Sequence, residues 1–194
     1  MMLTDQNIED RLMEGDLEIH PLDDPERQIQ PASIDLRLSP DDMASPVPQD
    51  GSAFDPEVER GASVAVPKTP NGYFLLKPNM FVLASTKESV TIPDDMVGRI
   101  EGRSSIGRIG VQVHATAGYC DPGFSGQITL EISNLHNDTP VRLYPDMYIA
   151  QLTLMECKSP AERPYGVRSE SKYQGQTGPT GSRLADDFEK EDRS

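Results

Sequence analysis

EGRSSIGRIGVQVHATAGYCDPGFSGQITLEISN, residues 101–134, is the stretch of the chain that decides the fold. From Gln127 to Ser133 it alternates between aliphatic and polar residues, which predicts a β-strand with one apolar and one polar face. The aliphatic face belongs in a core. Glu131 projects from the polar face, either into a pocket or into solvent. A glutamate in a partly dry pocket can serve as a proton carrier near neutral pH.

Short runs with β-strand character recur along the rest of the chain, separated by Pro and Gly at fairly regular intervals. This pattern is typical of an all-β sandwich, jelly roll or barrel. One helix should precede the strands, with Thr4 as its N-cap and Gly15 at its end. Residues 42–61, rich in Pro, Asp, Gly and Ser, should form a surface loop. The expected strands are residues 33–38, 72–76, 80–85, 89–92, 96–101, 111–113, 127–133, 141–143 and 148–155.

The formal net charge of −14, from 32 acidic and 18 basic residues, argues against a nucleic-acid partner, which requires a basic face. Because arginine supplies most of the positive charge, the acidic excess fits either a protein adapted to high salt or an ordinary acidic cytosolic protein. The two cysteines form no C-x-x-C motif, which indicates a reducing compartment. We see no signal peptide and no run of about 18 apolar residues, so we expect a cytoplasmic protein without a membrane partner.

The segment Arg103–Arg108 (RSSIGR) is the strongest candidate for binding phosphate. Its two guanidinium groups can pair bidentately with phosphate oxygens, and its two serine hydroxyls and main-chain N–H groups can add hydrogen bonds. The alternative is ordinary surface charge. The segment is not a Walker loop, because G-x-x-x-x-G-K-[ST] is absent from the chain. Asp121 lies in an Asp-Pro-Gly sequence, where it either forms a turn or serves the same site.

The histidines give no sign of a metal site. His20, His114 and His136 are scattered, and the zinc deaminase signature, H-x-E followed by P-C-x-x-C, is missing. We therefore expect no zinc and treat the three histidines as structural residues. A triphosphate ligand would bring its own Mg²⁺.

Residues 159–194 differ in composition from residues 1–158, which should form the β domain. This tail is polar and poor in aliphatic residues, so it cannot build a core of its own and is either a disordered tail or a lid that orders over a ligand. The lid interpretation rests on hydrogen-bonding side chains gathered in it: Tyr165, Lys172, Tyr173, Gln174 and Gln176.

Several stretches together resemble the dCTP deaminases of the trimeric dUTPase-like superfamily. They are QPASIDLRL at 30–38, RSSIGRIGVQVHATAG at 103–118, DPGFSGQITLEISN at 121–134, RPYG at 163–166 and SKYQGQTGPTGSR at 171–183. The resemblance covers nearly the whole chain, and residues 42–61 are its main departure. It implies a mainly β subunit with short helices, a distorted jelly roll or β-barrel of the dUTPase-like type. It also implies a homotrimer with active sites between subunits, and deamination without zinc.

The resemblance also implies roles for the candidate residues. Glu131 would deprotonate a water that attacks C4 of cytosine, and would then protonate the ring nitrogen and the departing ammonia. Arg108 and Ser104 would position the water and the tetrahedral centre, and Asp121 would bind the 3′-hydroxyl of deoxyribose. The remaining substrate contacts would come from the phosphate segment, the strand, residue 151 and the tail, namely Arg103, Ser105, Ile106, Gly107, Thr129, Leu130, Gln151, Tyr165, Lys172 and Gln176.

The pair Ala117-Gly118 bears on the product. It resembles the dUMP-forming members, which carry Gly where strict deaminases carry a bulkier His. A Gly would leave room for a second water that attacks the α-phosphate with the help of Asp121; alternatively, Gly118 only satisfies a turn dihedral. The leading hypothesis is a deaminase that converts dCTP through dUTP to dUMP, with dTTP as a candidate feedback inhibitor.

Four alternatives remain. Three keep the nucleotide as a ligand: a strict deaminase releasing dUTP, a plain dUTPase, or a non-catalytic regulator that binds dCTP or dTTP. Glu131 argues against the plain dUTPase, whose chemistry needs no proton carrier at the base. A regulator would usually have lost one of the residues Ser104, Arg108, Asp121 and Glu131. A β scaffold without a ligand leaves the cluster of phosphate-suited residues unexplained.

Overall fold

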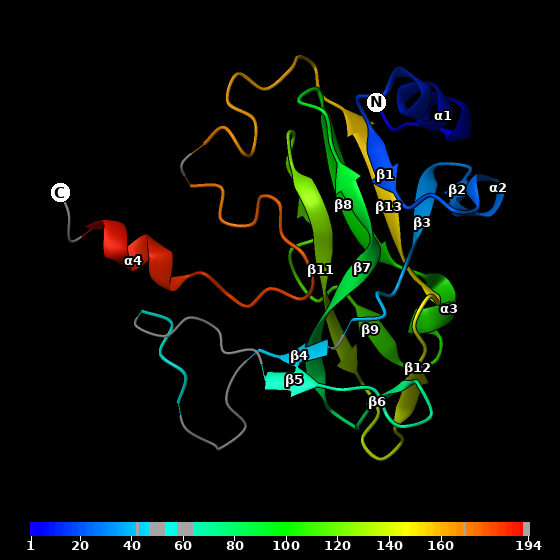
Figure 1. Ribbon diagram of the computed structural model, residues 1–194, viewed down its shortest axis with the longest axis vertical. Coiled ribbons are helices and arrows are strands. Elements are labelled where there is room, and N and C mark those ends of the chain that lie inside the picture. Colours follow the sequence, from blue (N-terminus) through cyan, green and yellow to red (C-terminus); the bar gives the residue numbers. More distant parts are fainter. Residues whose placement is uncertain (42, 47–52, 58–63, 169, 192–194) are drawn as a thin grey trace.

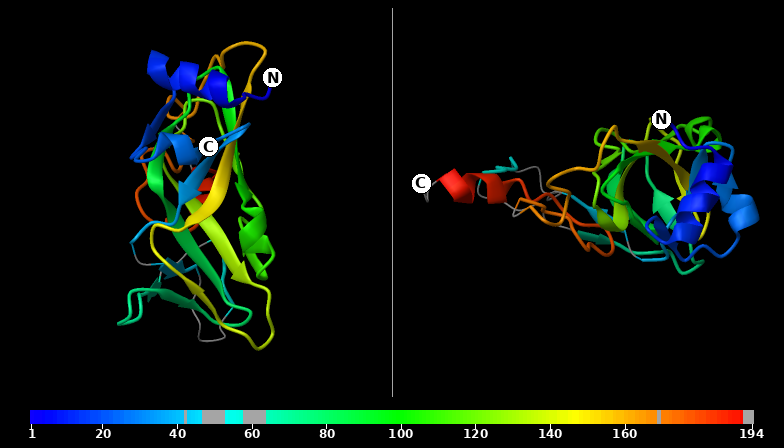
Figure 2. Two further views of the ribbon diagram at one scale, coloured as in Figure 1. Left: turned by 90° about the vertical axis from the view of Figure 1, so that its right-hand side faces the viewer. Right: turned by 90° about the horizontal axis from the view of Figure 1, so that it is seen from above.

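A computed structural model describes residues 1–41, 43–46, 53–57, 64–168 and 170–191 of the chain (Figure 1). Seen from above, the strands curve around a common interior (Figure 2). The helices are α1 (Asp5–Glu14), α2 (Pro25–Gln28), α3 (Ser104–Gly107) and α4 (Ala185–Glu191). The strands are β1 (Glu18–His20), β2 (Ile29–Gln30), β3 (Ser33–Arg37), β4 (Met43–Ser45), β5 (Val64–Val66), β6 (Phe74–Leu76), β7 (Phe81–Thr91), β8 (Met96–Gly102), β9 (Val111–Val113), β10 (Tyr119–Cys120), β11 (Ser125–Asn134), β12 (Val141–Leu143) and β13 (Tyr148–Glu156).

The strands form two main sheets. One is six-stranded, in the order β5-β4-β7-β11-β9, with β1 also paired to β7. The other is five-stranded, in the order β10-β8-β13-β3-β2, and β12 pairs with β6 in a small third sheet. All of these pairings are antiparallel. The prediction of a mainly β protein with short helices is confirmed.

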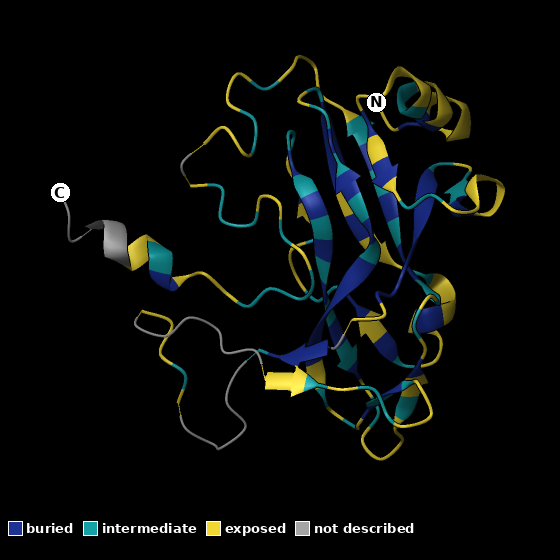
Figure 3. Ribbon diagram, viewed as in Figure 1, coloured by how far each residue is buried: buried dark blue, intermediate teal, exposed yellow. Residues whose placement is uncertain are grey.

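Strand β11 lies between β7 and β9 and follows the alternation that the sequence predicts. Leu130 and Ile132 are fully buried, whereas Thr129 and Glu131 on the opposite face are only partly buried (Figure 3). The buried face of β11 contributes to one continuous apolar core shared with both sheets. This strand therefore anchors the core with one face and presents polar side chains with the other.

The predicted break between residues 80–85 and 89–92 is wrong, because β7 runs through it as one strand. The charged residues there are not a solvent-exposed turn. Glu88 is fully buried and accepts hydrogen bonds from the Arg37 main-chain N–H (2.8 Å) and from Arg37 Nε (2.6 Å). These hydrogen bonds satisfy the buried charge of Glu88, so the strand continues through this residue.

The N-terminal helix prediction is confirmed, with Thr4 at the N-cap and Gly15 at the C-cap in a left-handed conformation (φ 80°). The expected loop at 42–61 is partly wrong, since Met43–Ser45 is a buried strand paired with β5 and β7. Residues 42, 47–52 and 58–61 of that prediction lie outside the described residues. No helix in the described parts of the chain is long and apolar enough to cross a membrane.

We expect Glu88→Ala to lower the free energy of unfolding by about 3–5 kcal/mol, because it leaves the buried Arg37 guanidinium without its main partner. Chemical denaturation would measure the loss. The matched control is Glu101→Ala, which removes an exposed ion pair with Arg99 and should cost less than about 1 kcal/mol. Equal losses in the two variants would contradict a structural role for the Arg37–Glu88 pair.

Candidate functional site

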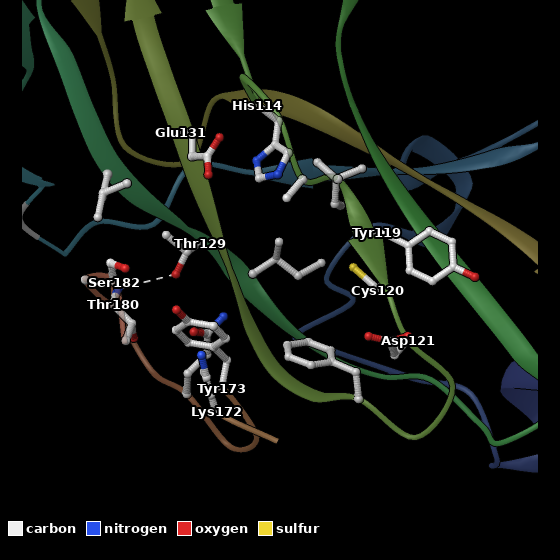
Figure 4. A pocket seen from close by; sticks show the side chains of 18 of the residues that line it. His114, Tyr119, Cys120, Asp121, Thr129, Glu131, Lys172, Tyr173, Thr180 and Ser182 are labelled. Atoms are coloured by element: carbon white, nitrogen blue, oxygen red, sulfur yellow. Dashed lines mark hydrogen bonds between the residues drawn. The ribbon is translucent and has the colours of Figure 1, made fainter. Parts of the chain in front are cut away.

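A pocket of about 620 Å³ opens beside the polar face of β11. Its walls come mainly from β11, from the segment 114–121 that precedes it, and from the C-terminal tail (residues 159–168 and 170–191), with β7 contributing as well. Figure 4 shows Glu131 and His114 on one side of the pocket and Asp121 on the other, with Lys172 and Tyr173 of the tail facing them. Three segments that are separate in the sequence therefore surround one space.

The side chain of Glu131 is held in a defined position at the pocket. Its Oε2 atom accepts hydrogen bonds from the main-chain N–H and the hydroxyl of Thr116, each at 3.1 Å. Its main-chain carbonyl accepts a hydrogen bond from the N–H of His114 (2.9 Å). These bonds fix one carboxylate oxygen and so orient the other, Oε1, relative to the pocket.

The segment 114–121 also carries Gly118 and Asp121 into the pocket wall. Gly118 lies against β8: its carbonyl accepts from the Ile100 N–H (2.7 Å), and an added Cβ would lie 2.4 Å from the Ile100 carbonyl oxygen. Gly118 is not among the residues with a positive φ, so a turn dihedral does not explain it. Close approach of two backbones is what requires glycine here. Cys120 beside it is buried, which raises the pKa of its thiol to about 12 and leaves it unreactive as a nucleophile.

The tail runs along the edge of β11 that β9 does not reach. Strand β9 pairs only with Ile132–Asn134, and the tail hydrogen-bonds to alternate residues before them. Two of these bonds join main-chain groups: the Gly175 N–H donates to the Ser125 carbonyl (2.7 Å), and the Gln127 N–H donates to the Gln176 carbonyl (3.0 Å). In two others a tail N–H donates to a side chain of β11: Gly178 to Gln127 Oε1 (2.6 Å), and Thr180 to Thr129 Oγ1 (3.3 Å). The tail is thus ordered against the sheet and closes one side of the pocket.

Main-chain groups of Thr129 point to this same edge. Hydrogen-bonding direction alternates along a strand, and both Gln127 and Glu131 use their main-chain groups on this side, toward Gln176 and His114. The N–H and C=O of Thr129 therefore point to the same side, between the contacts of Gln127 and Glu131. A planar ligand there could form hydrogen bonds with both groups at once. Leu130, its neighbour, is buried and pairs with Ala84 on β7.

The predicted phosphate segment lies elsewhere in the chain. α3 and its flanking residues are on the opposite side of the barrel from the tail (Figures 1 and 2). Arg108 and Ser104 are exposed and joined by a 3.3 Å hydrogen bond, and Ile106 is buried beneath them. In the part of the chain that the structure describes, none of residues 103–108 lines the pocket, nor does Gln151.

A buried aspartate supports the predicted phosphate segment, Arg103–Arg108, which we call the arginine cluster. Asp35 on β3 forms an ion pair with Arg103 (2.9 Å), and burial raises the pKa of Asp35, although the charge of Arg103 opposes that shift. Gln151 lies beside it and donates to Ser33 Oγ (3.3 Å). The Arg103 guanidinium also stacks over the Tyr148 ring, 5.5 Å from its centre. Arg103 is therefore held rigidly at the surface.

The structure thus sorts the predicted site residues into two groups. The pocket contains Ala117, Gly118, Asp121, Thr129, Glu131, Tyr165, Lys172 and Gln176. The opposite side carries Arg103, Ser104, Ser105, Ile106, Gly107, Arg108 and Gln151. Within one chain the acidic and tail residues meet each other, but the arginines do not join them.

Sequence reasoning missed several residues of the two groups. Thr116 supports the pocket through Glu131, and Asp35 supports the arginine cluster. A carboxylate in the middle of the alternating strand SIDLRL was the available signal for Asp35. No sequence signal placed Thr116 beside Glu131, because their contact depends on how segment 114–121 folds back. No group of three or more His, Cys, Asp or Glu residues able to hold a metal occurs in the described residues.

The fold and the pocket define a mainly antiparallel β protein with a tail-closed pocket for a small polar ligand. A family described as dCTP deaminase-like matches residues 2–157. The chain belongs to this dCTP deaminase-like family.

Named relatives cover almost the whole chain. A protein of Natronomonas pharaonis named dCTP deaminase is 54% identical over 192 residues, 97% of each chain. One of Dictyoglomus thermophilum named dCTP deaminase, dUMP-forming, is 50% identical over 201 residues, again 97% of each.

A solved structure supports the fold. The 2′-deoxycytidine 5′-triphosphate deaminase from Agrobacterium tumefaciens aligns with a TM-score of 0.56 at 23% identity. The alignment covers 79% of this chain and 47% of that one, so this chain spans about half the length of the solved protein.

We expect Gly118→Ala to lower the free energy of unfolding by about 1–3 kcal/mol, because the new Cβ would collide with the Ile100 carbonyl. Thermal unfolding would measure the change. Gly107→Ala is the matched control, since nothing lies within 4 Å of its added Cβ and the helix favours alanine. A Gly118→Ala protein as stable as the control would show that the backbones at position 118 can separate freely.

Proposed function

We propose that the protein is a dCTP deaminase that converts dCTP and two waters to dUMP, ammonia and diphosphate. Family membership and the dUMP-forming relatives support the reaction. The observation that carries the proposal is the carboxylate of Glu131, oriented by Thr116 at the open edge of β11. Mg²⁺ would arrive bound to the triphosphate as part of the substrate, and the reaction would take place in the cytoplasm.

Glu131 carries the protons of the deamination step in this proposal. Cytosine binds in the plane of the β11 edge, where the main-chain N–H and C=O of Thr129 match acceptor and donor groups on the base. Glu131 takes a proton from a water as its oxygen bonds to C4, and the proton passes to N3. Glu131 then takes the proton of the new C4 hydroxyl and gives it to the amino group, the C4–N bond breaks, the C4 carbonyl forms, and ammonia leaves. Each transfer restores Glu131 for the next.

The arginines would come from a neighbouring copy of the chain. One chain holds Glu131 and Asp121 on one side of the barrel and Arg108 and Ser104 on the other, so a single chain cannot use both groups on one nucleotide. A closed ring of three chains would place the arginine cluster of each against the pocket of the next. Arg103, held by Asp35, would bind phosphate, and Arg108 would stabilise the tetrahedral centre.

The tail would complete the phosphate site. Lys172, Tyr165 and Gln176 already lie at the pocket, so they can reach a triphosphate without a large movement. Asp121 would bind the deoxyribose 3′-hydroxyl and then activate a second water. That water attacks the α-phosphorus, the bond to the bridging oxygen breaks, and dUMP and diphosphate separate. dTTP shares the sugar and triphosphate, so it would compete for the same contacts as a feedback inhibitor.

A strict deaminase that releases dUTP is the second candidate. It is favoured by the relatives named simply dCTP deaminase, from Natronomonas pharaonis and Haloarcula marismortui, at 54% and 50% identity. The relatives named dCTP deaminase, dUMP-forming, favour dUMP, and the resemblance of Ala117-Gly118 to such members supports the same product. Chromatography of the products from dCTP and Mg²⁺ separates the two: dUMP with diphosphate supports the proposal, and accumulating dUTP contradicts the second step.

We expect Glu131→Gln to lower the rate of ammonia release from dCTP by about 10²- to 10⁴-fold, because glutamine cannot accept a proton. The variant should keep its oligomeric state by size-exclusion chromatography, since Glu131 is not part of the core. Glu101→Gln, an exposed change on β8, should retain full activity. Ammonia release at the normal rate from Glu131→Gln would contradict the role of Glu131 as the proton carrier.

A mixing experiment tests the shared site. Glu131→Gln and Arg108→Gln should each be inactive alone. Co-expressed, they should recover on the order of a quarter of normal activity, because half of the pockets and half of the arginine clusters remain intact and combine at random. Mixed oligomers without activity would place both residues in a site within one chain.

A further inference from the structure

His114 has two ring nitrogens that lack any partner. Both are buried from solvent, and neither forms a hydrogen bond within the described residues. The residue nevertheless lines the pocket, beside Glu131, to whose main-chain carbonyl its N–H donates a hydrogen bond. Buried polar atoms without partners are rare in native proteins, because each costs the hydration that it has lost. His136 offers a contrast: it lies outside the pocket, and its Nε2 forms a hydrogen bond with the Ile109 carbonyl at 2.9 Å.

The backbone of His114 is strained as well. Its φ of 68° lies in the left-handed region, which residues with a Cβ seldom occupy. The hydrogen bond from its N–H to the Glu131 carbonyl holds it there, at the end of β9. Strain and unsatisfied polar atoms at one residue indicate a function that requires this geometry. If the ring served only for packing, an apolar side chain on an unstrained backbone would give a more stable protein.

The groups around His114 indicate what its ring nitrogens could bind. Thr116 binds Oε2 of Glu131, which leaves Oε1 for another partner. Figure 4 shows the imidazole next to that carboxylate, on the same side of the pocket. On its other side the ring edge lies 3.4 Å from the position that a Cβ of Gly118 would take. A neutral imidazole offers one donor and one acceptor, the complement of a single water molecule.

We propose that His114 is a positioning residue that holds the attacking water against Glu131. The water would donate one hydrogen bond to Oε1 and form a second with the imidazole. These two bonds would direct a lone pair of the water oxygen toward C4 of the base. This rests on the proposed deamination. The base itself would be held by the main chain of Thr129, so His114 would act on the water and not on nucleotide affinity. His114 was interpreted from the sequence as a structural histidine, and the proposal replaces that interpretation.

The test compares three substitutions in the full-length protein, after the wild-type protein has been shown to release ammonia from dCTP. His114→Phe keeps the ring volume without nitrogens. His114→Asn keeps a donor and an acceptor and tolerates the left-handed backbone. His114→Gly removes both ring and strain. Absence of wild-type ammonia release would be a failure of the proposed function, and the variants speak only to His114.

We expect His114→Phe to melt at or above the wild-type temperature and to lose about 10²-fold in kcat with the KM for dCTP unchanged. His114→Asn should recover part of kcat, and added imidazole should raise the rate of His114→Gly. The control His136→Phe should show the reverse pattern, a lower melting temperature and unchanged kcat, because it breaks a satisfied bond.

Two outcomes would overturn the proposal. An unchanged kcat in His114→Phe would mean that the ring nitrogens do no work in the reaction. A loss that falls on KM instead of kcat would mean that the ring contacts the nucleotide and not the water. A loss in kcat accompanied by partial recovery in His114→Asn would support it.

Discussion

The whole site depends on one edge of β11 that is left without a neighbouring strand for most of its length. β9 pairs with only the last three residues of β11, so the main-chain groups from Ser125 to Glu131 on that side need other partners. The tail satisfies the first part, and His114 satisfies the last. The gap between them, at Thr129, is the position where we propose that the base binds. One incomplete sheet edge thus holds the tail and leaves main-chain groups open beside the pocket.

The fold was largely predictable because alternation is a strong local signal. The pattern around Leu130 and Ile132 gave the correct strand and the correct buried face, and the helix signals at Thr4 and Gly15 were also correct. Errors arose where long-range pairing overrode composition. Glu88 is charged yet buried, because Arg37 from a distant strand neutralises it, and no local pattern contains that information. The buried strand Met43–Ser45 was hidden by the Pro-rich residues that follow it.

The sequence identified candidate site residues but not how they are arranged in space. Residue types alone suggested proton transfer at Glu131 and phosphate binding at Arg103–Arg108. That the two lie on opposite sides of the barrel follows from sheet topology, since α3 leaves the five-stranded sheet after β8 whereas β11 belongs to the other sheet. No pattern in the sequence indicated the role proposed for His114, for a different reason. A backbone dihedral and missing hydrogen bonds exist only in the folded chain.

The tail is attached to β11 chiefly through amide groups. The bonds of Gly175, Gln176, Gly178 and Thr180 join uncharged donors to uncharged acceptors, and salt screens such contacts little. Attraction between arginines and a triphosphate is screened strongly, and the surrounding chain carries a net charge of −14. Ionic strength therefore acts on the two parts of the site separately. Raising the salt concentration would leave the tail bound to β11 while weakening any attraction between the arginines and a negatively charged ligand.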